Sequence, residues 1–335
     1  SQFCVCLRWW IPSRACALNT KNGVNGVANT SPANEKQSAI VLRDVRKHYG
    51  AVHAVDGVDL KIPQGQVFGL IGHNGAGKST LFKMMLGLER PTSGHITVAG
   101  ADVAGPNFRA ARRKLGYLPE NVVLYDNLSG LETLNFFARL KGASLQECPS
   151  LLDKVGLSHA GKRAVREYSK GMRQRLGFAQ ALLGKPEVLF LDEPTNGLDP
   201  QAIRDFYFTL RELQQTGVTI VITSHILSEL QERVDSLAIL AAGKLQAQGS
   251  VQQLREDTGL PLVVEVDVAA ERQSQVIEAV RTLVQAEPVM LPQGVRFECS
   301  REQKMAVLAV LAPLALQDIR LLEPSLEDMF FGFSG

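Results

Sequence analysis

A glycine-rich segment between residues 72 and 79 has the residue types that bind a phosphate chain. It follows an apolar stretch at 67–71, opens a stretch with helical spacing of apolar residues, and fits the pattern G-x-x-x-x-G-K-[ST]. Glycines let backbone N–H groups curl around phosphate oxygens, the lysine reaches the outer phosphates, and the hydroxyl can bind Mg²⁺. The alternative is a glycine-rich turn that binds no ligand. The segment consists of Gly72, His73, Asn74, Gly75, Ala76, Gly77, Lys78 and Ser79.

Two acidic residues follow a second apolar stretch. Asp192 and Glu193 come directly after residues 188–191, which have the pattern of a buried strand. An acidic residue at such a strand end, beside a phosphate-binding segment, can hold a metal ion, and Asp192 is that candidate. Glu193 would orient or deprotonate the attacking water, because phosphoryl transfer depends mainly on positioning and charge neutralisation. Taken alone, the pair is equally well explained as a solvated turn.

Two further segments are less specific. His225 follows a third apolar stretch at 218–223, and an imidazole there could contact the outermost phosphate. A histidine at a strand end is more often structural. Residues 168–175 have, by themselves, the pattern of a capped helix start with exposed basic side chains.

The elements that must position these residues alternate between strands and helices. Apolar stretches flanked by helical periodicity predict a parallel sheet. Shorter alternating stretches at 40–42 and 58–62 predict an antiparallel edge sheet, and residues 127–183 are helical throughout. We therefore expect an α/β fold with a parallel core sheet, an antiparallel β part and a helical part at about 121–183. The expected core strands are 67–71, 188–191, 218–223 and 237–240.

The two ends of the chain differ from this central part. Residues 1–38 show no period and are rich in Asn, Gly, Ser and Lys, which predicts a disordered or non-native tail. After the central domain, placed at 39–255, the pattern restarts as a small α/β domain at 260–335. Its expected strands are 263–268, 295–299 and 318–322, and its expected helices are 274–284 and 302–311.

Composition excludes several classes of protein. The 335 residues hold 36 basic and 34 acidic side chains, and this near-balance argues against a protein that binds nucleic acid through a basic surface. The longest wholly apolar run, 305–316, has 12 residues, whereas a membrane span needs about 20. Among five cysteines, Cys4 and Cys6 form only an incomplete metal site, and the six histidines are scattered. We expect no nucleic-acid partner and no membrane span.

In their order along the chain, these motifs resemble an ABC-transporter ATP-binding cassette, over about residues 40–250. The resemblance implies that ATP and Mg²⁺ bind, and that the protein hydrolyses ATP. It identifies residues 72 to 79 with Thr80 as the Walker A loop, and Asp192 with Glu193 as the Walker B pair. Ser79 and Asp192 would hold the metal, and Glu193 would be catalytic.

The same resemblance assigns roles to residues that carry little signal of their own. Tyr49, upstream of the phosphate loop, would stack on adenine. Ser169 and Gly171 stand in the signature segment, Asp199 in the D-loop, and His225 is the catalytic switch histidine. The implied assembly is a head-to-tail homodimer with ATP between the protomers. It would bind a polytopic membrane permease at the cytoplasmic face of the inner membrane.

Three positions depart from the usual cassette. Glu120 stands where the family has a glutamine at the nucleotide site, and a carboxylate cannot donate the hydrogen bond that an amide donates. Lys170 and Met172 replace a glycine and a glutamine of the signature, changes that occur in cassettes of ABC-2-type exporters. The segment at 323–330, near the C-terminus, also resembles cassettes of ABC-2-type exporters.

A narrower resemblance covers residues 115–121, 136–142 and 168–184, which are similar to the ATPase subunit of the transporter family that matures nitrous oxide reductase. It implies copper-related delivery with a periplasmic copper-handling subunit. No cluster of residues in the sequence indicates copper. The alternatives are an ABC-2-type exporter of a drug, lipid or polysaccharide, and a soluble ABC ATPase acting on ribosomes or DNA. The single set of motifs argues against the last.

Overall fold

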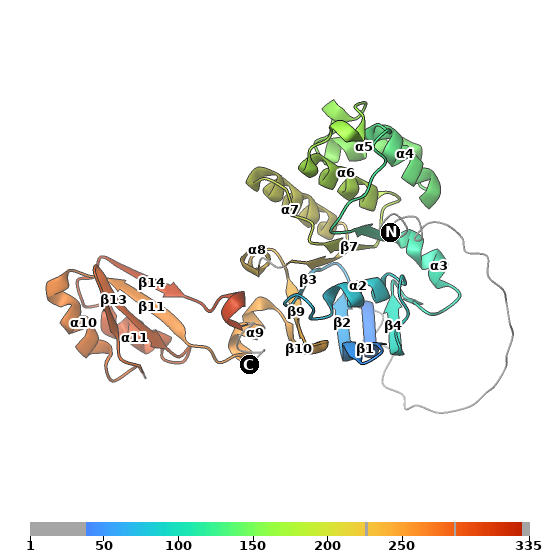
Figure 1. Cartoon of the computed structure of the whole chain (residues 1–335). Coiled ribbons are helices and arrows are strands. Elements are labelled where there is room, and N and C mark those ends of the chain that lie inside the picture. Colours follow the sequence, from blue (N-terminus) through green and yellow to red (C-terminus); the bar gives the residue numbers. More distant parts are fainter. Residues whose placement is uncertain (1–37, 225–226, 285, 330–335) are drawn as a thin grey trace. The chain divides into compact units, whose positions relative to one another are not determined.

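The computed structural model describes residues 38–224, 227–284 and 286–329 (Figure 1). The tail predicted at 1–38 lies outside these residues except for Ser38, which begins the first strand. The described chain forms two compact units. One holds the residues up to 224 together with Arg233–Gln248, and the other holds Leu227–Glu232 together with the residues from Gly249. The domain limits predicted from sequence, 39–255 and 260–335, stay predictions.

A six-stranded sheet forms the centre of the first unit, in the order β10-β9-β3-β8-β7-β6. The five strands from β9 to β6 are parallel, which confirms the predicted parallel core sheet. Parallel sheets are covered on both faces, and β3 and β8 are accordingly buried at every residue. The strands are β3 (Val67–Ile71), β6 (Leu115–Leu118), β7 (Val188–Asp192), β8 (Thr219–Thr223), β9 (Ser236–Ala241) and β10 (Lys244–Gly249).

An antiparallel sheet in the order β2-β1-β4-β5 confirms the second predicted layer. One apolar core joins this sheet to β3 and to the helix α2 (Lys78–Met85), and Phe82 of α2 packs edge-on against Phe190 of β7, with ring centroids 5.5 Å apart. The helix that begins with Lys78 is therefore held from both sheets. The strands are β1 (Ser38–Tyr49), β2 (Val52–Pro63), β4 (Ser93–Val98) and β5 (Ala101–Asp102).

Residues 127–183, predicted to be helical throughout, hold three α-helices and three 3-10 turns joined by short non-helical segments. Helix α4 begins with a capping box, in which Ser129 and Glu132 each bond the other's backbone N–H. No helix in the described parts of the chain is long and apolar enough to cross a membrane. The helices of this unit are α2, α3 (Phe108–Ala111), α4 (Gly130–Lys141), α5 (Cys148–Lys154), α6 (Lys170–Leu182) and α7 (Pro200–Gln215). Short 3-10 turns lie at Arg112–Lys114, Leu145–Glu147, Ser158–Ala160 and Val165–Glu167.

The second unit contains a four-stranded antiparallel sheet in the order β12-β13-β11-β14. Its chain order is β-α-β-β-α-β, the split βαβ arrangement. The strand β12 was not predicted, because it has three residues and two of them, Val289 and Met290, are exposed. The predicted helix 274–284 ends earlier, at Val280. The elements are α8 (Leu227–Gln231), α9 (Val251–Asp257), β11 (Leu262–Asp267), a 3-10 turn (Ala270–Arg272), α10 (Gln273–Val280), β12 (Val289–Leu291), β13 (Gly294–Cys299), α11 (Lys304–Leu311) and β14 (Asp318–Leu322).

A buried lysine ties the helical part to the parallel sheet. Lys141, the last residue of α4, donates from Nζ to the carbonyl oxygen of Leu115 in β6 at 2.9 Å. Burial lowers the pKa of Lys141 from 10.5 to about 8, against a smaller opposing effect of Glu147. The charged form is therefore disfavoured in the folded state, and the unfolded chain binds more protons between pH 8 and pH 10.5.

Stability should consequently rise with pH across that window. Relative to a Lys141→Met variant, the free energy of unfolding of the parent is expected to increase by about 2–3 kcal/mol between pH 7 and pH 10. Urea denaturation at each pH unit measures this difference. Lys154→Met, which removes a lysine of α5 that pairs with Glu212, controls for the loss of one lysine side chain. If the difference in free energy of unfolding between the parent and Lys141→Met does not change with pH, the lowered pKa of Lys141 is wrong.

Candidate functional site

The candidate residues gather where the parallel strands end. The strands β3, β8, β7 and β6 are paired in register, with Leu70 beside Thr223, Asp192 beside Thr223, and Leu118 beside Leu191. The carboxyl ends of parallel strands meet at one edge of a sheet, and ligands bind there in open α/β folds. The phosphate-loop candidates follow β3, the acidic pair ends β7, and Glu120 lies two residues after β6.

The loop after β3 has a shape that only glycine allows at two positions. A Cβ at Gly72 would lie 2.5 Å from the carbonyl oxygen of Leu240, and a Cβ at Gly77 would lie 2.4 Å from that of Ala54. Gly77 also has a φ of +101° directly before α2, and Gly75 has a φ of +85°. The backbone is therefore shaped as a close-packed cradle at a helix start, which suits phosphate oxygens.

Lys78 lies over this loop. Its side chain is largely buried, and Nζ donates to the carbonyl oxygens of Gly72 at 2.5 Å and His73 at 3.1 Å. Burial lowers the pKa of Lys78, while the nearby carboxylates of Glu193 and Asp192 raise it. The ammonium group is thus placed between the loop and the acidic pair.

A threonine hydroxyl joins the two acidic residues. Thr223 Oγ1 donates to Asp192 Oδ1 at 2.7 Å and accepts from the backbone N–H of Glu193 at 3.0 Å. Glu193 has a φ of +48°, an unusual value for a residue with a side chain, and this bond helps to hold it. Thr223 is fully buried and was not identified as a site residue from the sequence. Only its position opposite Asp192 on the neighbouring strand would identify it, and that position is known only once the strand order is known.

The ionisation of Asp192 depends on its neighbours. The pKa of Asp192 is raised, first by burial and then by the charges of Glu120 and Glu193, while the hydrogen bond from Thr223 and the charge of Lys78 oppose this shift. The carboxylates of Asp192 and Glu193 thus lie near the Lys78 ammonium group, and Glu120 adds a third negative charge near Asp192. A polyphosphate would add further negative charge, which a divalent cation can offset. The carboxylate of Asp192 and the exposed hydroxyl of Ser79, in the first turn of α2, are hard oxygen ligands that suit Mg²⁺.

The signature candidates lie on a different part of the unit. Ser169 caps α6 by accepting from the backbone N–H of Met172 at 3.2 Å, and a Cβ at Gly171 would lie 3.1 Å from the carbonyl oxygen of Gly197. Helix α6 packs against α4, α5 and β6, whereas α2 packs against β2 and β4 (Figure 1). Asp199 caps α7 through the backbone N–H of Ala202 at 2.9 Å. The signature candidates are therefore grouped with the segment before Asp199 rather than with the loop after β3.

A buried glutamine connects these parts and was missed in the sequence. Gln174 of α6 donates from Nε2 to the carbonyl oxygen of Pro194 at 3.0 Å, directly after the acidic pair. Its position one turn into helix α6 gave no indication in the sequence that its side chain contacts another segment. It links helix α6 to the segment that follows Glu193.

The remaining candidate residues differ in how exposed they are. Tyr49, the last residue of β1, is 46% exposed, and the Lys47 ammonium lies 5.0 Å from its ring centroid. His225 lies outside the described residues. In the loop, His73 and Asn74 are exposed at the surface, Ala76 is buried, and Thr80 is half-buried in α2.

Comparisons with known proteins show the family and the fold of this chain. The profile of the family described as ABC transporter matches residues 55–196. An uncharacterized ABC transporter ATP-binding protein of Bacillus subtilis, YhcH, is 35% identical over 89% of this chain and 97% of its own length. The daunorubicin resistance ATP-binding protein DrrA3 of Streptomyces coeruleorubidus is 33% identical over 89% of this chain and 96% of its own. A solved structure of an ATP binding subunit of an ABC transporter has a TM-score of 0.62 and 33% identity, over 66% of this chain and 94% of that one.

Proposed function

Because the chain belongs to the ABC transporter ATP-binding proteins, which are ATP-hydrolysing subunits, we propose that it drives an ABC-2-type exporter. The observation that carries the proposal is the grouping of Lys78, Asp192, Glu193 and Glu120 at the carboxyl edge of the parallel sheet. An ammonium group beside a glycine cradle binds phosphates, and buried carboxylates beside it serve a metal ion and a water molecule.

Each residue has a role in this proposal. Lys78 binds the β- and γ-phosphates, and Ser79 and Asp192 hold Mg²⁺, which supplies neutralisation of the phosphate charge. Glu193 orients the attacking water and accepts its proton. Thr223 fixes Asp192 and Glu193 relative to each other through one hydroxyl.

Thr223→Val keeps the shape of the side chain and removes this hydroxyl. We expect ATP turnover to fall about tenfold and the free energy of unfolding to fall by about 1–3 kcal/mol, because buried partners of the hydroxyl lose their hydrogen bonds. Steady-state ATPase rates and urea denaturation measure both effects. Thr223→Ser restores the hydroxyl and should recover most of the turnover. A serine variant as slow as the valine variant would show that packing, rather than the hydroxyl, matters.

The cargo that the comparisons favour is a drug-like molecule. The relative DrrA3 is named for daunorubicin resistance, and its alignment covers 96% of its length and 89% of this chain. The narrower prediction of copper delivery for nitrous oxide reductase, with a periplasmic copper-handling subunit, has no counterpart in the names of the relatives reported above. Export of a drug, the alternative to copper, is therefore the function we propose.

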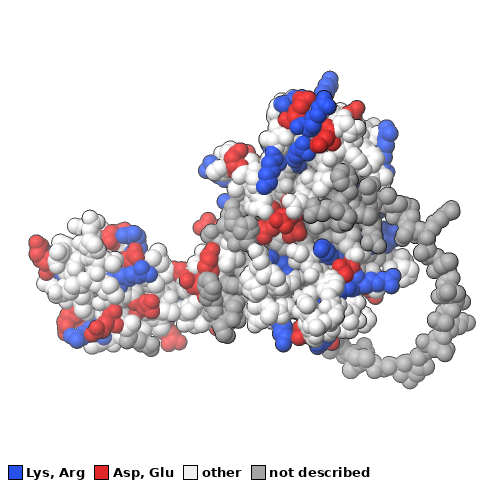
Figure 2. Space-filling view, viewed as in Figure 1, with Lys and Arg blue, Asp and Glu red and all other residues white. Residues whose placement is uncertain are grey.

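The proposed assembly is a head-to-tail homodimer bound to a permease at the cytoplasmic face of the membrane. Ser169 and Gly171 of one protomer would face the phosphate loop of the other, which their grouping apart from α2 supports. Tyr49 would stack on adenine through its exposed ring, and His225 would contact the γ-phosphate. On the face shown in Figure 2, basic side chains lie among acidic ones, which favours a protein partner over nucleic acid.

Purification of the tagged full chain from detergent-solubilised membranes tests the proposal. A polytopic membrane protein should copurify, and daunorubicin should stimulate the ATPase activity of the complex while copper ions should not. Stimulation by copper without an effect of the drug would restore the copper assignment. Recovery of ribosomal proteins without a membrane protein would overturn the transport function altogether.

A further inference from the structure

Two of the histidines that are scattered in sequence lie together in the fold. His48 and His53 are paired directly across the hairpin formed by β1 and β2. Their rings are stacked, with centroids 4.0 Å apart and an interplanar angle of 26°. The pairing arises because the hairpin turn lies between them, so that five residues of separation in sequence become neighbouring positions on the sheet.

A carboxylate completes the cluster. One ligand atom from each of His48, His53 and Asp56 lies within 4.8 Å of those of the other two. In tetrahedral coordination, two ligand atoms bound to one ion at about 2.1 Å are about 3.4 Å apart. Side-chain rotations that move each ligand atom by about 1 Å would therefore bring the three groups to one ion.

One histidine of the cluster has a buried nitrogen without a hydrogen-bond partner. His48 Nε2 is buried, and the described residues provide no hydrogen-bond partner for it. A buried polar atom without a partner costs free energy. A bound metal ion would give this nitrogen a partner that the protein does not supply.

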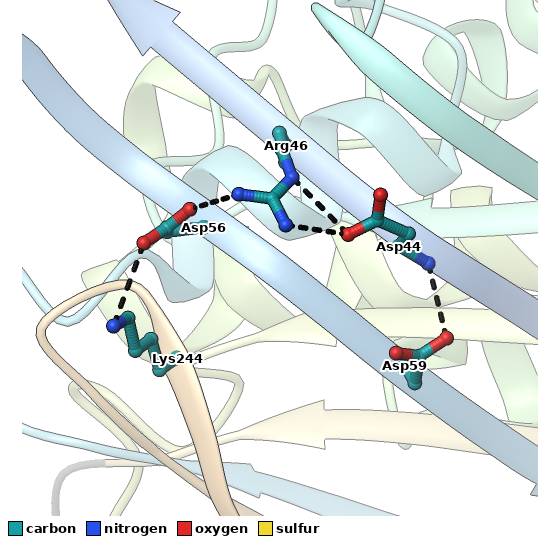
Figure 3. A network of polar contacts seen from close by, with 5 residues as sticks. All are labelled: Asp44, Arg46, Asp56, Asp59 and Lys244. Atoms are coloured by element: carbon teal, nitrogen blue, oxygen red, sulfur yellow. Dashed lines mark hydrogen bonds and ion pairs between the residues drawn. The ribbon is translucent and has the colours of Figure 1, made fainter.

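The position of Asp56 is set by its neighbours, as Figure 3 shows. Asp56 Oδ1 accepts from Arg46 Nη1 at 2.7 Å, and Arg46 is held in turn by two bonds to Asp44, at 2.8 and 3.1 Å. Asp56 Oδ2 has the looser partner, Lys244 Nζ at 3.6 Å. Such contacts around a site orient a carboxylate that binds a metal ion. Asp56 Oδ2 can exchange the Lys244 ammonium group for a metal ion.

We propose that His48, His53 and Asp56 bind a late first-row divalent ion, with Cu²⁺ and Zn²⁺ the best candidates. Two imidazoles with one carboxylate favour these ions over Mg²⁺ or Ca²⁺, which prefer oxygen ligands alone. Three protein ligands leave a position for water or another ligand. The site lies at the end of the hairpin that carries Tyr49, so a bound ion would fix that hairpin. The inference does not depend on the proposed cargo or on ATP hydrolysis.

The test uses the untagged full chain with Cys4, Cys6 and Cys16 replaced by serine in every variant, because thiols compete for the same ions. Zn²⁺ titrated into this protein without nucleotide should bind at one site, and His53→Ala, which removes an exposed side chain, should weaken that site at least about tenfold. His95→Ala, an exposed histidine on β4 of the same sheet, should leave the affinity unchanged.

Electron paramagnetic resonance of bound Cu²⁺ provides a second readout. The parent should show coupling to two imidazole nitrogens, and His53→Ala should show coupling to one. Equal affinity for Zn²⁺ in the parent and in His53→Ala would overturn the site. A Cu²⁺ spectrum that is identical in both proteins would also overturn it.

Discussion

Replacing Glu193 by glutamine is expected to lower ATP turnover by at least about 10²-fold while leaving ATP affinity nearly unchanged. The amide keeps the size of the side chain but cannot accept the proton of the attacking water, and general bases contribute about 10²–10⁴-fold to such reactions. The backbone bond from Glu193 N–H to Thr223 Oγ1 is retained, and glutamine tolerates the φ of +48° as well as glutamate does. The loss should therefore appear in kcat rather than in binding.

Steady-state hydrolysis and equilibrium binding of ATP, measured on the same preparation, separate these quantities. Glu187→Gln is a matched control. Glu187 directly precedes β7, at the end of the strand opposite Glu193, and forms an exposed ion pair with Lys114. That variant should hydrolyse ATP at the parental rate. If Glu193→Gln retains normal turnover, Glu193 has no role in positioning or deprotonating water, and another group must be sought near Asp192.

Much of the parallel sheet could be predicted from sequence, because strands buried on both faces are continuous apolar stretches. The strands β3, β7 and β8 are of this kind, and each ends beside a residue predicted to do chemistry. Edge strands carry less signal. Strand β6 has four residues and β10 alternates between exposed and half-buried positions, so neither stood out. The placement of Glu120 after β6 consequently rested on resemblance alone.

Contacts that depend on register could not be predicted. Thr223 is an ordinary strand residue until β8 is placed beside β7, which sets its hydroxyl against Asp192. The pairing of His48 with His53 likewise needs the exact hairpin register, because a shift of one residue moves a side chain to the other face. Helical periodicity similarly revealed the α6 segment but gave no reason to expect that Gln174 bonds the loop after β7.

Lys78→Ala is expected to abolish measurable ATP binding, and with it hydrolysis. The ammonium group makes two hydrogen bonds to loop carbonyls, from Gly72 and His73, and each hydrogen bond to a charged group contributes about 1.5–3 kcal/mol. Loss of comparable bonds to phosphate oxygens would weaken binding by at least about 10²-fold. Without Lys78, the negative charges of Asp192 and Glu193 at this sheet edge also lose the positive charge that Lys78 provides.

The fold should survive this change, since alanine is the best helix former and Lys78 is the first residue of α2. Lys83→Ala, which removes an exposed lysine from the same helix, controls for a general loss of positive charge and should bind ATP normally. Isothermal titration with ATP and Mg²⁺ compares the parent with Lys78→Ala, Lys83→Ala and Glu193→Gln. Binding lost in Lys78→Ala but kept in Glu193→Gln would separate phosphate recognition from water activation at a single sheet edge. ATP bound with parental affinity by Lys78→Ala would mean that the glycine cradle and the helix start hold the phosphates without the lysine.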